Sequence, residues 1–426
     1  MLEKINNIKG TYDLLPEDSA LWRGVEKTVI DIISSFGYSE IRTPILEYTQ
    51  LFKRSIGEVT DIVEKEMYTF SDNEKHMLTL RPENTASCVR ASIQNSLFYG
   101  NNPRVFYSGP MFRHENPQKG RYRQFNQIGA EAFGEASPDM DFEMILMTAK
   151  LWEALGISSK ATLELNSIGS LEARKHYREK LVEYFSQHKD QLDQDSLARL
   201  ERNPLRILDS KNPEMGVLIA NAPQLTEFLD AESREHFEQL CGLLKAHNID
   251  FTLNPLLVRG LDYYNRTVFE WVTDCLGAQG TICAGGRYDS LVEQLGGDAV
   301  PGCGFAMGVE RIIEVVQIAN PDFVFQADVD VFIAAVGQSE VVLFAASIAE
   351  NLRKNQSLRV MENRGGGNFK KQLKKANRSK ARLAIICGEH EVSERVVTIK
   401  DMSSGEEFKN VAVGALTDQI ASLLSH

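Results

Sequence analysis

The sequence predicts an α+β domain with an antiparallel sheet and a helical insertion, followed by a separate α/β domain. Three observations support this fold class. Strand-like segments up to residue 165 occur in neighbouring pairs among helices, as in an α+β domain. Residues 171–247 then show almost only a charged, helix-period pattern. Beyond residue 322, strands and helices alternate as in an α/β domain. The predicted bounds are 1–322, with the insertion at about 171–248, and 327–426.

The elements before the insertion follow from apolar spacing and from turn residues. One apolar stripe predicts a helix from Glu17 to Phe36, and Gly37 closes it. Residues 39–47 alternate like a strand, but Pro44 cannot donate in a central ladder, so we expect an edge or an interface. The other expected elements are a hairpin of Met67–Phe70 and Met77–Leu80, a helix Asn84–Phe98, strands Arg104–Glu115 and Phe125–Gly134, a helix Asp139–Leu155 and a strand Ala161–Leu165.

After the insertion, strand and helix patterns return in two groups. The first group has strands at Phe251–Val258, Thr267–Val272 and Gly280–Ala284, then a glycine-rich stretch and a helix within 302–318. Asn320-Pro321-Asp322 is a plausible boundary. The second group has strands Val329–Val336, Leu358–Met361 and Leu383–Cys387 and helices Val341–Lys354 and Phe369–Asn377.

Composition describes an ordinary globular chain and excludes several classes of protein. The 426 residues are 43% hydrophobic and 25% charged, enough for two to three domains. No apolar run reaches the ~18 residues of a membrane helix, and no signal-peptide pattern opens the chain, so we expect a cytoplasmic protein without membrane contact. The six cysteines form no CxxC pair, which favours reduced thiols over a zinc site. Because the net charge is −12, nucleic-acid contact has to come from local basic patches.

The segment from Arg104 to Arg123 is one such patch, with five Lys or Arg and one acid. It contains Phe112-Arg113-His114-Glu115, and its loop carries Arg121 and Arg123. Taken alone, the charge is better explained by a solvated hairpin tip. The next strand favours a ligand, because residues of one parity share a face.

That parity puts Gln127, Gly129 and Glu131 on one side of the strand. The glycine leaves room for close approach, and a buried core face would not normally carry an unpaired amide and carboxylate. In Arg81-Pro82-Glu83-Asn84-Thr85, Glu83 and Thr85 fit the first turn of a helix, and they also fit a site for an ammonium group. The two interpretations are compatible.

Three further segments suggest anion binding beside backbone turns. In Arg259-Gly260-Leu261-Asp262-Tyr263-Tyr264 a guanidinium, which forks onto carboxylate or phosphate, stands beside two phenols; the alternative is a strand-end turn with surface tyrosines. Gly285-Gly286-Arg287-Tyr288 makes room for a ligand or forms a tight turn. Arg311 lies in the first turn of a helix, where a cation opposes the dipole, so it serves either a ligand or a nearby acid.

The stretch from Arg364 to Arg382 contains eight Lys or Arg and no acid. Phe369, Leu373 and Ala376 form one helical stripe, and the basic residues Lys370, Lys371, Lys374, Lys375 and Arg378 lie off it. An exposed amphipathic helix would look similar. Because the chain as a whole is acidic, this local excess of positive charge favours contact with an RNA backbone.

In this order, the segments resemble the class II aminoacyl-tRNA synthetases. The strand through Pro44 resembles motif 1, Phe112–Glu115 with its loop resembles motif 2, and Gly308–Arg311 resembles motif 3. Arg259–Tyr264 and Ala284–Asp289 resemble the two signatures of histidyl-tRNA synthetases of bacterial type. The resemblance covers the whole chain, including the insertion and a C-terminal anticodon-binding domain. Asn126 departs from the His expected in close bacterial relatives, but it lies on the strand face opposite Gln127.

The resemblance implies that the chain activates L-histidine with ATP and transfers it to the 3′ end of tRNA(His). It also implies a role for each matching residue. Glu83, Thr85 and Gln127 would hold the amino group of histidine, Glu131 and Tyr264 its imidazole, and Tyr263 and Tyr288 would complete that site. Arg113, Arg121, Glu115 and Arg311 would bind ATP, and Arg259 would bridge the histidine carboxylate and the α-phosphate, which makes Arg259 and Arg113 the catalytic residues. Arg123, Lys370, Lys371 and Lys374 would contact tRNA.

The same resemblance implies a homodimer joined through motif 1, Mg²⁺ accompanying ATP, and no tightly bound cofactor or protein metal site. Two rival functions belong to the same fold. A regulatory paralogue of a histidine-biosynthetic phosphoribosyltransferase lacks the C-terminal domain and has eroded signatures, whereas this chain keeps both. The second rival is a synthetase for threonine, proline or glycine. Glu131 paired with Tyr264 suits an imidazole, which argues against it.

Overall fold

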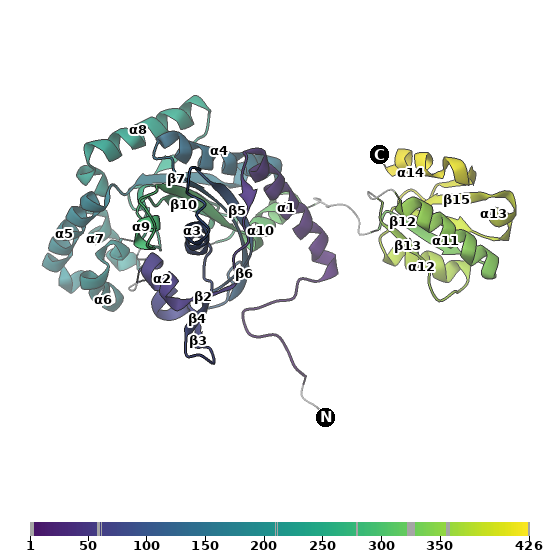
Figure 1. The fold of residues 1–426 in the computed structure, drawn as a ribbon, viewed down its shortest axis with the longest axis horizontal. Helices are drawn as coiled ribbons and strands as arrows, with labels where there is room; N and C mark the ends of the chain where they lie inside the picture. The colour runs from purple at the N-terminus through teal and green to yellow at the C-terminus, as the bar shows by residue number, and fades with distance from the viewer. Residues whose placement is uncertain are drawn as a thin grey trace. The chain divides into compact units, whose positions relative to one another are not determined.

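The computed structural model describes residues 4–57, 60, 62–208, 210, 212–277, 280–321, 329–354 and 358–424. Two compact units make up the chain, Met1–Leu14 with Trp22–Phe323 and Leu15–Leu21 with Val324–His426 (Figure 1). The predicted domain ends at residues 322 and 327 fall outside the described residues. Among the helices that are described, none has the length and apolar character needed to cross a membrane.

An eight-stranded, mostly antiparallel sheet organises the first unit. Only the outer pairs β1–β5 and β7–β8 are parallel. In order across the sheet, the strands are β1 (Ser39–Glu40), β5 (Arg104–Phe112), β6 (Gln124–Phe133), β11 (Gly302–Gly308), β10 (Thr281–Arg287), β9 (Asn265–Val272), β7 (Thr162–Ser167) and β8 (Thr252–Leu253). The predicted antiparallel α+β domain is confirmed.

Helices cover this sheet, and a small second sheet extends from it. Trp271 of β9 donates from its indole nitrogen to the hydroxyl of Thr148 at 2.8 Å, so the helix that carries Thr148 packs directly on the sheet. Outside the insertion the helices are α1 (Pro16–Ser35), α2 (Thr49–Ile56), α3 (Thr85–Gln94), α4 (Pro138–Ala154), α9 (Leu291–Gln294) and α10 (Val309–Ala319). The small sheet has the order β2 (Leu46–Tyr48), β4 (Met77–Leu80) and β3 (Tyr68–Ser71), which confirms the predicted hairpin.

The segment after β7 is helical, as predicted, and forms a lobe at the side of the sheet (Figure 1). Its helices are α5 (Leu171–Gln187), α6 (Gln194–Arg202), α7 (Gly216–Ala220) and α8 (Ala231–Ala246). Side chains such as Tyr177, Leu181 and Phe185 of α5 belong to the same apolar cluster as Tyr263 and Tyr264. The insertion and the segment after β8 therefore share one core.

Four predicted elements differ from the structure. The expected strand at 39–47 is two short strands in different sheets, because residues 41–44 between them join neither sheet and the chain bends at Ile45. Strand β1 stands at the edge of the large sheet, as Pro44 suggested. The expected strand at 251–258 shrinks to Thr252–Leu253, and Pro255 lies just beyond it. The expected helix at 84–98 ends at Gln94. The glycine-rich start of 302–318 is a central strand, β11, and Gly285 and Gly286 lie within β10 rather than in a turn.

The second unit has a five-stranded sheet with helices on both faces. Val331 and Ile333 of its strand β12 (Val331–Ala335) pack with one helical layer, and Phe332 and Ala334 pack with Ala376 on the opposite face. This alternation suits a sheet that is buried on both sides. Across the sheet the strands are β13 (Val360–Glu362), β12 (Val331–Ala335), β14 (Leu383–Cys387), β15 (Val396–Asp401) and β16 (Glu407–Ala412), and the helices are α11 (Ser339–Arg353), α12 (Phe369–Arg378), α13 (Glu389–Glu394) and α14 (Leu416–Leu424).

Candidate active site

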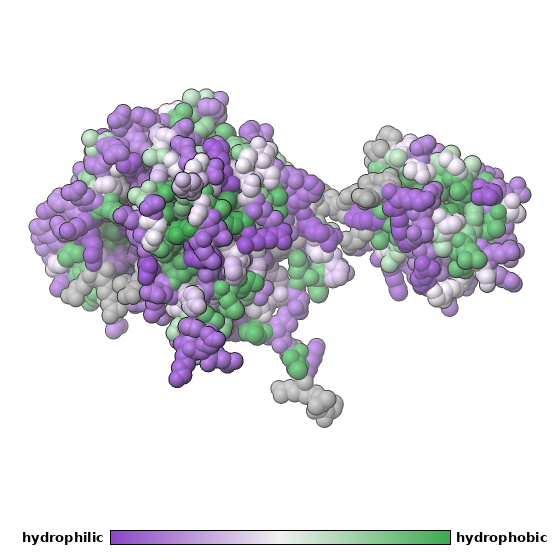
Figure 2. Space-filling model, in the orientation of Figure 1, coloured by the Kyte–Doolittle hydropathy of each residue, from purple (hydrophilic) through white to green (hydrophobic). Residues whose placement is uncertain are grey.

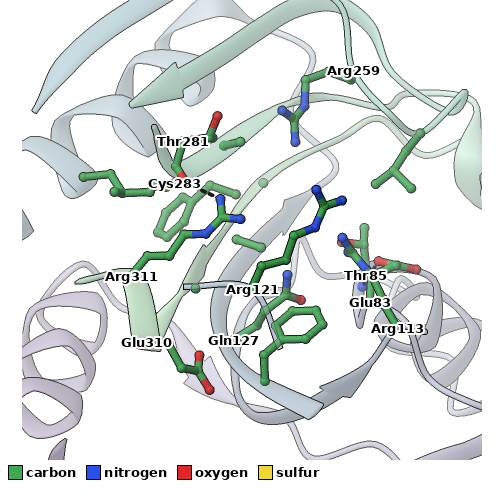
Figure 3. Close-up of a pocket in the computed structure, with 18 of the residues that line it drawn as sticks. Glu83, Thr85, Arg113, Arg121, Gln127, Arg259, Thr281, Cys283, Glu310 and Arg311 are labelled. Carbon is green, nitrogen blue, oxygen red and sulfur yellow. Dashed lines mark hydrogen bonds between the residues drawn. The ribbon is translucent and has the colours of Figure 1, made fainter. Parts of the chain in front are cut away.

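A cavity of about 170 Å³ opens over the middle of the large sheet (Figure 3). Its walls come from β6, β10 and β11, from the start of α3 and α10, and from the loops at 113–122 and 259–264. The predicted site residues that line it are Glu83, Thr85, Arg113, Glu115, Arg121, Gln127, Glu131, Arg259, Tyr263, Tyr264 and Arg311. Segments separated by more than 200 residues in the chain thus meet around one space.

Glu131 stands at the buried end of the cavity, 1% exposed. Its carboxylate accepts a hydrogen bond from the Thr85 hydroxyl at 2.7 Å and another from the Tyr288 hydroxyl. Burial raises the pKa of Glu131 to about 8, although both hydrogen bonds act in the opposite direction. A Cβ at Gly304 of β11 would overlap the Glu131 carboxylate, so glycine is required opposite this side chain.

Glu83 joins the cavity to the start of α3. Its two carboxylate oxygens accept from the backbone N–H groups of Thr85 at 2.6 Å and Ala86 at 3.0 Å, so the carboxylate caps the helix as its position in the sequence suggested. Each oxygen keeps a second lone pair for a ligand, so the capping role and the ligand role are compatible.

The side-chain oxygen of Gln127 in the cavity wall has no hydrogen-bond partner within the described structure. Tyr107, a buried residue of β5, lines the same wall, and its phenol interacts with Thr85 and Glu131. Tyr107 lies against Gly129, and a Cβ at position 129 would overlap the phenol oxygen. Unpaired buried polar atoms cost free energy, and a polar ligand would remove that cost.

Arg259 approaches the cavity from the opposite wall (Figure 3). It forms an ion pair with Glu270 of β9, and its guanidinium carbon lies 5.5 Å from the centre of the Tyr264 ring. The second oxygen of Glu270 accepts from the Thr281 hydroxyl at 2.8 Å. One carboxylate and one hydroxyl of the sheet therefore hold this guanidinium in place.

Arg311 is held by backbone oxygens. Its Nε donates to the carbonyl of Gly120 at 3.0 Å and its Nη1 to the carbonyl of Thr281 at 2.6 Å. Thr281 thus fixes Arg311 with its carbonyl while its hydroxyl binds Glu270. Neutral carbonyls leave the guanidinium charge uncompensated by these contacts, so Arg311 serves an anionic ligand better than an arginine bound to a carboxylate would.

Two more guanidinium groups face the same space. Arg113 donates from Nε to the carbonyl of Pro82 at 2.9 Å and lies 5.2 Å from the centre of the Phe125 ring. Arg121 forms an ion pair with Glu115. Together with Arg259 and Arg311, these side chains place four guanidinium groups in the lining of a cavity that also contains the carboxylates of Glu83 and Glu131. The arrangement suits a ligand that is anionic at one end and cationic or polar at the other.

Five predicted residues lie outside the cavity wall. Tyr288 stands behind Glu131 and donates to it. Arg123 is turned away: its N–H donates to the carbonyl of Gly10 at 2.7 Å and its Nε to that of Glu115 at 3.2 Å. Lys370, Lys371 and Lys374 are exposed on α12 in the second unit. Asn126 is also outside the lining and binds Glu310 through both its backbone N–H and its side-chain amide.

Sequence reasoning missed Tyr12, Tyr107, Glu270, Thr281 and Glu310. Glu310 accepts from the Tyr12 hydroxyl at 2.9 Å, and burial raises its pKa. Such a pair, far apart in the chain, leaves no signal in sequence spacing. Glu270 was more accessible to prediction, because a carboxylate within the apolar strand Thr267–Val272 calls for a cationic partner. Over the residues that the structure describes, no group of His, Cys, Asp and Glu side chains is arranged to hold a metal ion.

Comparison with known proteins identifies both units. Residues 10–312 match the family described as histidyl-tRNA synthetase, and residues 330–423 match the anticodon binding domain family. The apo histidyl-tRNA synthetase of S. aureus is 34% identical, with a TM-score of 0.81 over 98% of this chain and 100% of its own. The histidyl-tRNA synthetase of Nostoc sp. shares the fold at 18% identity and a TM-score of 0.73, covering 99% of this chain and all of its own. A Bacillus halodurans protein titled as an ATP phosphoribosyltransferase regulatory subunit/histidyl-tRNA synthetase shares it at 20% identity and 0.65, covering 91% of this chain and 99% of its own.

Proposed function

This chain belongs to the histidyl-tRNA synthetase family and is a histidine–tRNA ligase, and we propose that its central cavity is where L-histidine reacts with ATP. The observation that carries this proposal is the polarity of the cavity. Its lining contains four arginines, which form a cationic group, and Glu83, Gln127 and Glu131, which form a group of acceptors. Histidine presents a carboxylate to the first group and an ammonium and an imidazole to the second.

We assign the recognition of histidine to the side of the cavity with the carboxylates. Glu83, Thr85 and Gln127 hold the ammonium group, and the unpartnered oxygen of Gln127 supplies one acceptor. Glu131 and Tyr264 bind the imidazole nitrogens, with Tyr263 beside them and Tyr288 fixing Glu131 from behind. A site built from buried polar partners rejects amino acids that lack those atoms by roughly 10⁴ or more, so no separate editing step is needed.

We assign activation to the arginines. ATP enters with Mg²⁺ as a substrate complex, and Arg113, Arg121 and Arg311, with Glu115 orienting Arg121, bind its phosphates. A carboxylate oxygen of histidine attacks the α-phosphorus, the bond to the β-phosphate oxygen breaks, and pyrophosphate leaves. Arg259 bridges the carboxylate and the α-phosphate, where negative charge accumulates in the transition state. Glu270 and Thr281 hold Arg259 in that position before substrate arrives.

Transfer follows on the same cavity when a ribose hydroxyl at the 3′ end of tRNA(His) attacks the activated carbonyl and AMP leaves. We propose that the exposed lysines Lys370, Lys371 and Lys374 of α12 contact the tRNA phosphates. Asn368 caps that helix by accepting from the N–H of Lys371 at 3.0 Å, and buried Gln372 ties it to Ala335 of β12. Arg123 is assigned to tRNA by resemblance alone.

We propose that the protein acts in the cytoplasm as a homodimer. Ile45, Leu46, Tyr48, Phe70 and Met77, on or beside the small sheet β2–β4–β3, are each at least 40% exposed, which is typical of a surface that a partner covers. Pro44, in the segment that resembles motif 1, directly precedes this group. The tip of the β3–β4 hairpin itself is hydrophilic (Figure 2).

If the chain were instead a regulatory paralogue, it would not activate an amino acid. An amino-acid-dependent ATP–pyrophosphate exchange assay separates this alternative from the proposed function. The purified chain should exchange pyrophosphate into ATP with histidine and not with threonine, proline or glycine. It should also form histidyl-tRNA with tRNA(His). Exchange driven by another amino acid, or no exchange by folded protein, would overturn the assigned function.

A further inference from the structure

The loop that carries Arg259 and Tyr264 is tied to the helical insertion through Arg174. This arginine lies in the first turns of α5, and its Nη1 donates to two backbone carbonyls, those of Asp262 at 3.2 Å and Tyr264 at 2.5 Å. The two carbonyls flank Tyr263, so one guanidinium spans the centre of the loop. A charged donor makes stronger hydrogen bonds than a neutral one, and Arg holds two acceptors with little loss of its own freedom.

Neighbouring contacts converge on the same short segment. Asn203, at the end of α6, donates from its side-chain nitrogen to the Asp262 carboxylate at 3.4 Å. The N–H of Asp262 donates to the carbonyl of Ile56 at 3.1 Å, on the side of α2. Just after the loop, Arg266 exchanges backbone hydrogen bonds with Gly169 and Ile168, which directly precede the insertion. Residues at the base of the insertion therefore hydrogen-bond to the loop at its middle and just after its end.

These hydrogen bonds lie behind the loop residues whose side chains face the cavity. Tyr263 and Tyr264 stack with ring centres 4.7 Å apart, and the Arg259 guanidinium lies 5.5 Å from the Tyr264 ring. Arg174 itself is absent from the cavity lining, and its hydrogen bonds go to the backbone of the loop. A shift of that backbone by a fraction of an ångström would redirect the Tyr264 phenol and the Arg259 guanidinium together.

We propose that Arg174 is a positioning residue: through the carbonyls of Asp262 and Tyr264, the helical insertion sets the geometry of the histidine end of the active site. This inference rests on the proposed assignment of Tyr264 and Arg259 to histidine. It gives the insertion a part in amino-acid activation, a step in which tRNA takes no part. Misplacing a reacting group by about 1 Å costs as much as 10²-fold in rate, so a small displacement of the loop is measurable.

Substitution at Arg174, assayed by histidine-dependent ATP–pyrophosphate exchange with active-site titration, tests the proposal. Arg174→Met keeps the apolar stem and removes every donor, and Arg174→Lys keeps the charge. For the Met variant we expect KM for histidine to rise at least fivefold and kcat to fall, with KM for ATP within twofold of the unaltered chain. The KM for histidine and the kcat of the Lys variant should lie between those of the Met variant and those of the unaltered chain. Lys175→Ala, an exposed neighbour on the same helix, is the matched control and should change nothing.

The possible outcomes are distinct. A merely structural role would lower the thermal midpoint and the titrated active fraction while leaving KM for histidine unchanged, and that result would overturn the proposal. If the Met variant does not fold, the Lys variant decides: KM for histidine within 1.5-fold of the unaltered value, a resolution set by the assay and roughly 0.2 kcal/mol, contradicts positioning. Failure of the unaltered chain to exchange with histidine would instead refute the assigned active site.

Discussion

Arg259 combines an ion pair to Glu270 with an aromatic contact to Tyr264, and it lines the cavity. In the proposed role, replacing it with alanine removes a charge that stabilises the α-phosphate in the transition state. We expect Arg259→Ala to lower kcat/KM for histidine-dependent exchange by about 10²–10³-fold, equivalent to roughly 2.7–4 kcal/mol. Survival of exchange within about tenfold would contradict the assigned role.

The control for this substitution is Glu270, because Arg259→Ala also leaves a carboxylate unpaired. The double variant Arg259→Ala/Glu270→Gln removes that complication, and it should remain as impaired as the single variant. Glu270→Gln alone keeps the guanidinium but weakens its support, so we expect a smaller loss, on the order of tenfold. The three variants together form a double-mutant cycle.

Glu131 gives the folded protein a pH dependence. Its pKa is about 8 when folded and 4.5 for a free side chain, so between these values the folded carboxyl holds a proton that the unfolded chain releases. Stability from this group is therefore complete below about pH 4.5 and is lost as the pH rises toward 8. Relative to Glu131→Gln, the unaltered chain should lose stability across this window, by a few kcal/mol at most.

Urea unfolding at pH 5, 6, 7 and 8, followed by tryptophan fluorescence, measures this difference. All three tryptophans, Trp22, Trp152 and Trp271, lie in the first unit, so the signal reports on the unit that contains Glu131. A stability difference between the two proteins that stays constant from pH 5 to pH 8 would show that Glu131 titrates normally.

Individual site residues could be predicted where the local sequence pattern itself indicated contact with a ligand. Gln127 and Glu131 share a strand parity, and both line the cavity. The partners that hold such residues were not predictable, because they depend on how distant segments meet. Tyr288 lies 157 positions from Glu131 and Tyr12 lies 298 from Glu310, and no spacing rule reports such a contact.

At the scale of elements, sequence predicted those with strong local signals. Helix α4 begins with Pro138 at its first position and ends within one residue of the predicted end. Strand β11 was missed because glycines at 302, 304 and 308 weaken any local preference for a strand. Its conformation is set by its neighbours β6 and β10, and its glycines make room for the Tyr288 ring and the Glu131 carboxylate.

Helix α12 matches its predicted amphipathic pattern in part: Ala376 is buried and Lys371 and Lys374 are exposed, but Phe369 of the predicted apolar stripe is 39% exposed. The double substitution Lys371→Glu/Lys374→Glu should weaken tRNA binding at least tenfold. It should also lower the slope of log affinity against log salt concentration by about one for each lysine–phosphate pair that it removes. Adenylate formation should not change, because these residues lie in the other unit.

Lys354→Glu/Lys409→Glu is the matched control, since it changes the net charge equally at exposed sites of the same unit away from α12. Filter binding at two or more salt concentrations, beside pyrophosphate exchange, measures both effects. Equal weakening by both double variants would point to bulk charge and not to a contact at α12.

At the scale of the whole molecule, the exposed apolar group at β2–β4–β3 predicts a dimer. Tyr48→Lys with Phe70→Lys places charge on residues that are 60% and 44% exposed in the single chain, where a partner would bury them. We expect sedimentation at micromolar concentration to show a dimer for the unaltered chain and a monomer for this variant. Val217→Lys, at a 74% exposed site in the insertion, should leave the dimer intact. An unaltered chain that sediments as a monomer would refute the assembly.

The order of strands in the large sheet also governs how the protein is made. Strand β6 pairs with β5 on one side, but its other neighbour, β11, is about 170 residues later in the chain. At about 5–20 residues per second, a ribosome needs roughly 10–30 s to supply it. Throughout that interval β6, whose second half is buried in the folded protein, presents an unpaired edge of the kind that joins other chains. The candidate histidine site thus rests on a strand that the newly made half of the protein cannot protect by itself, and we expect nascent chains of this protein to need shielding until Gly308 emerges.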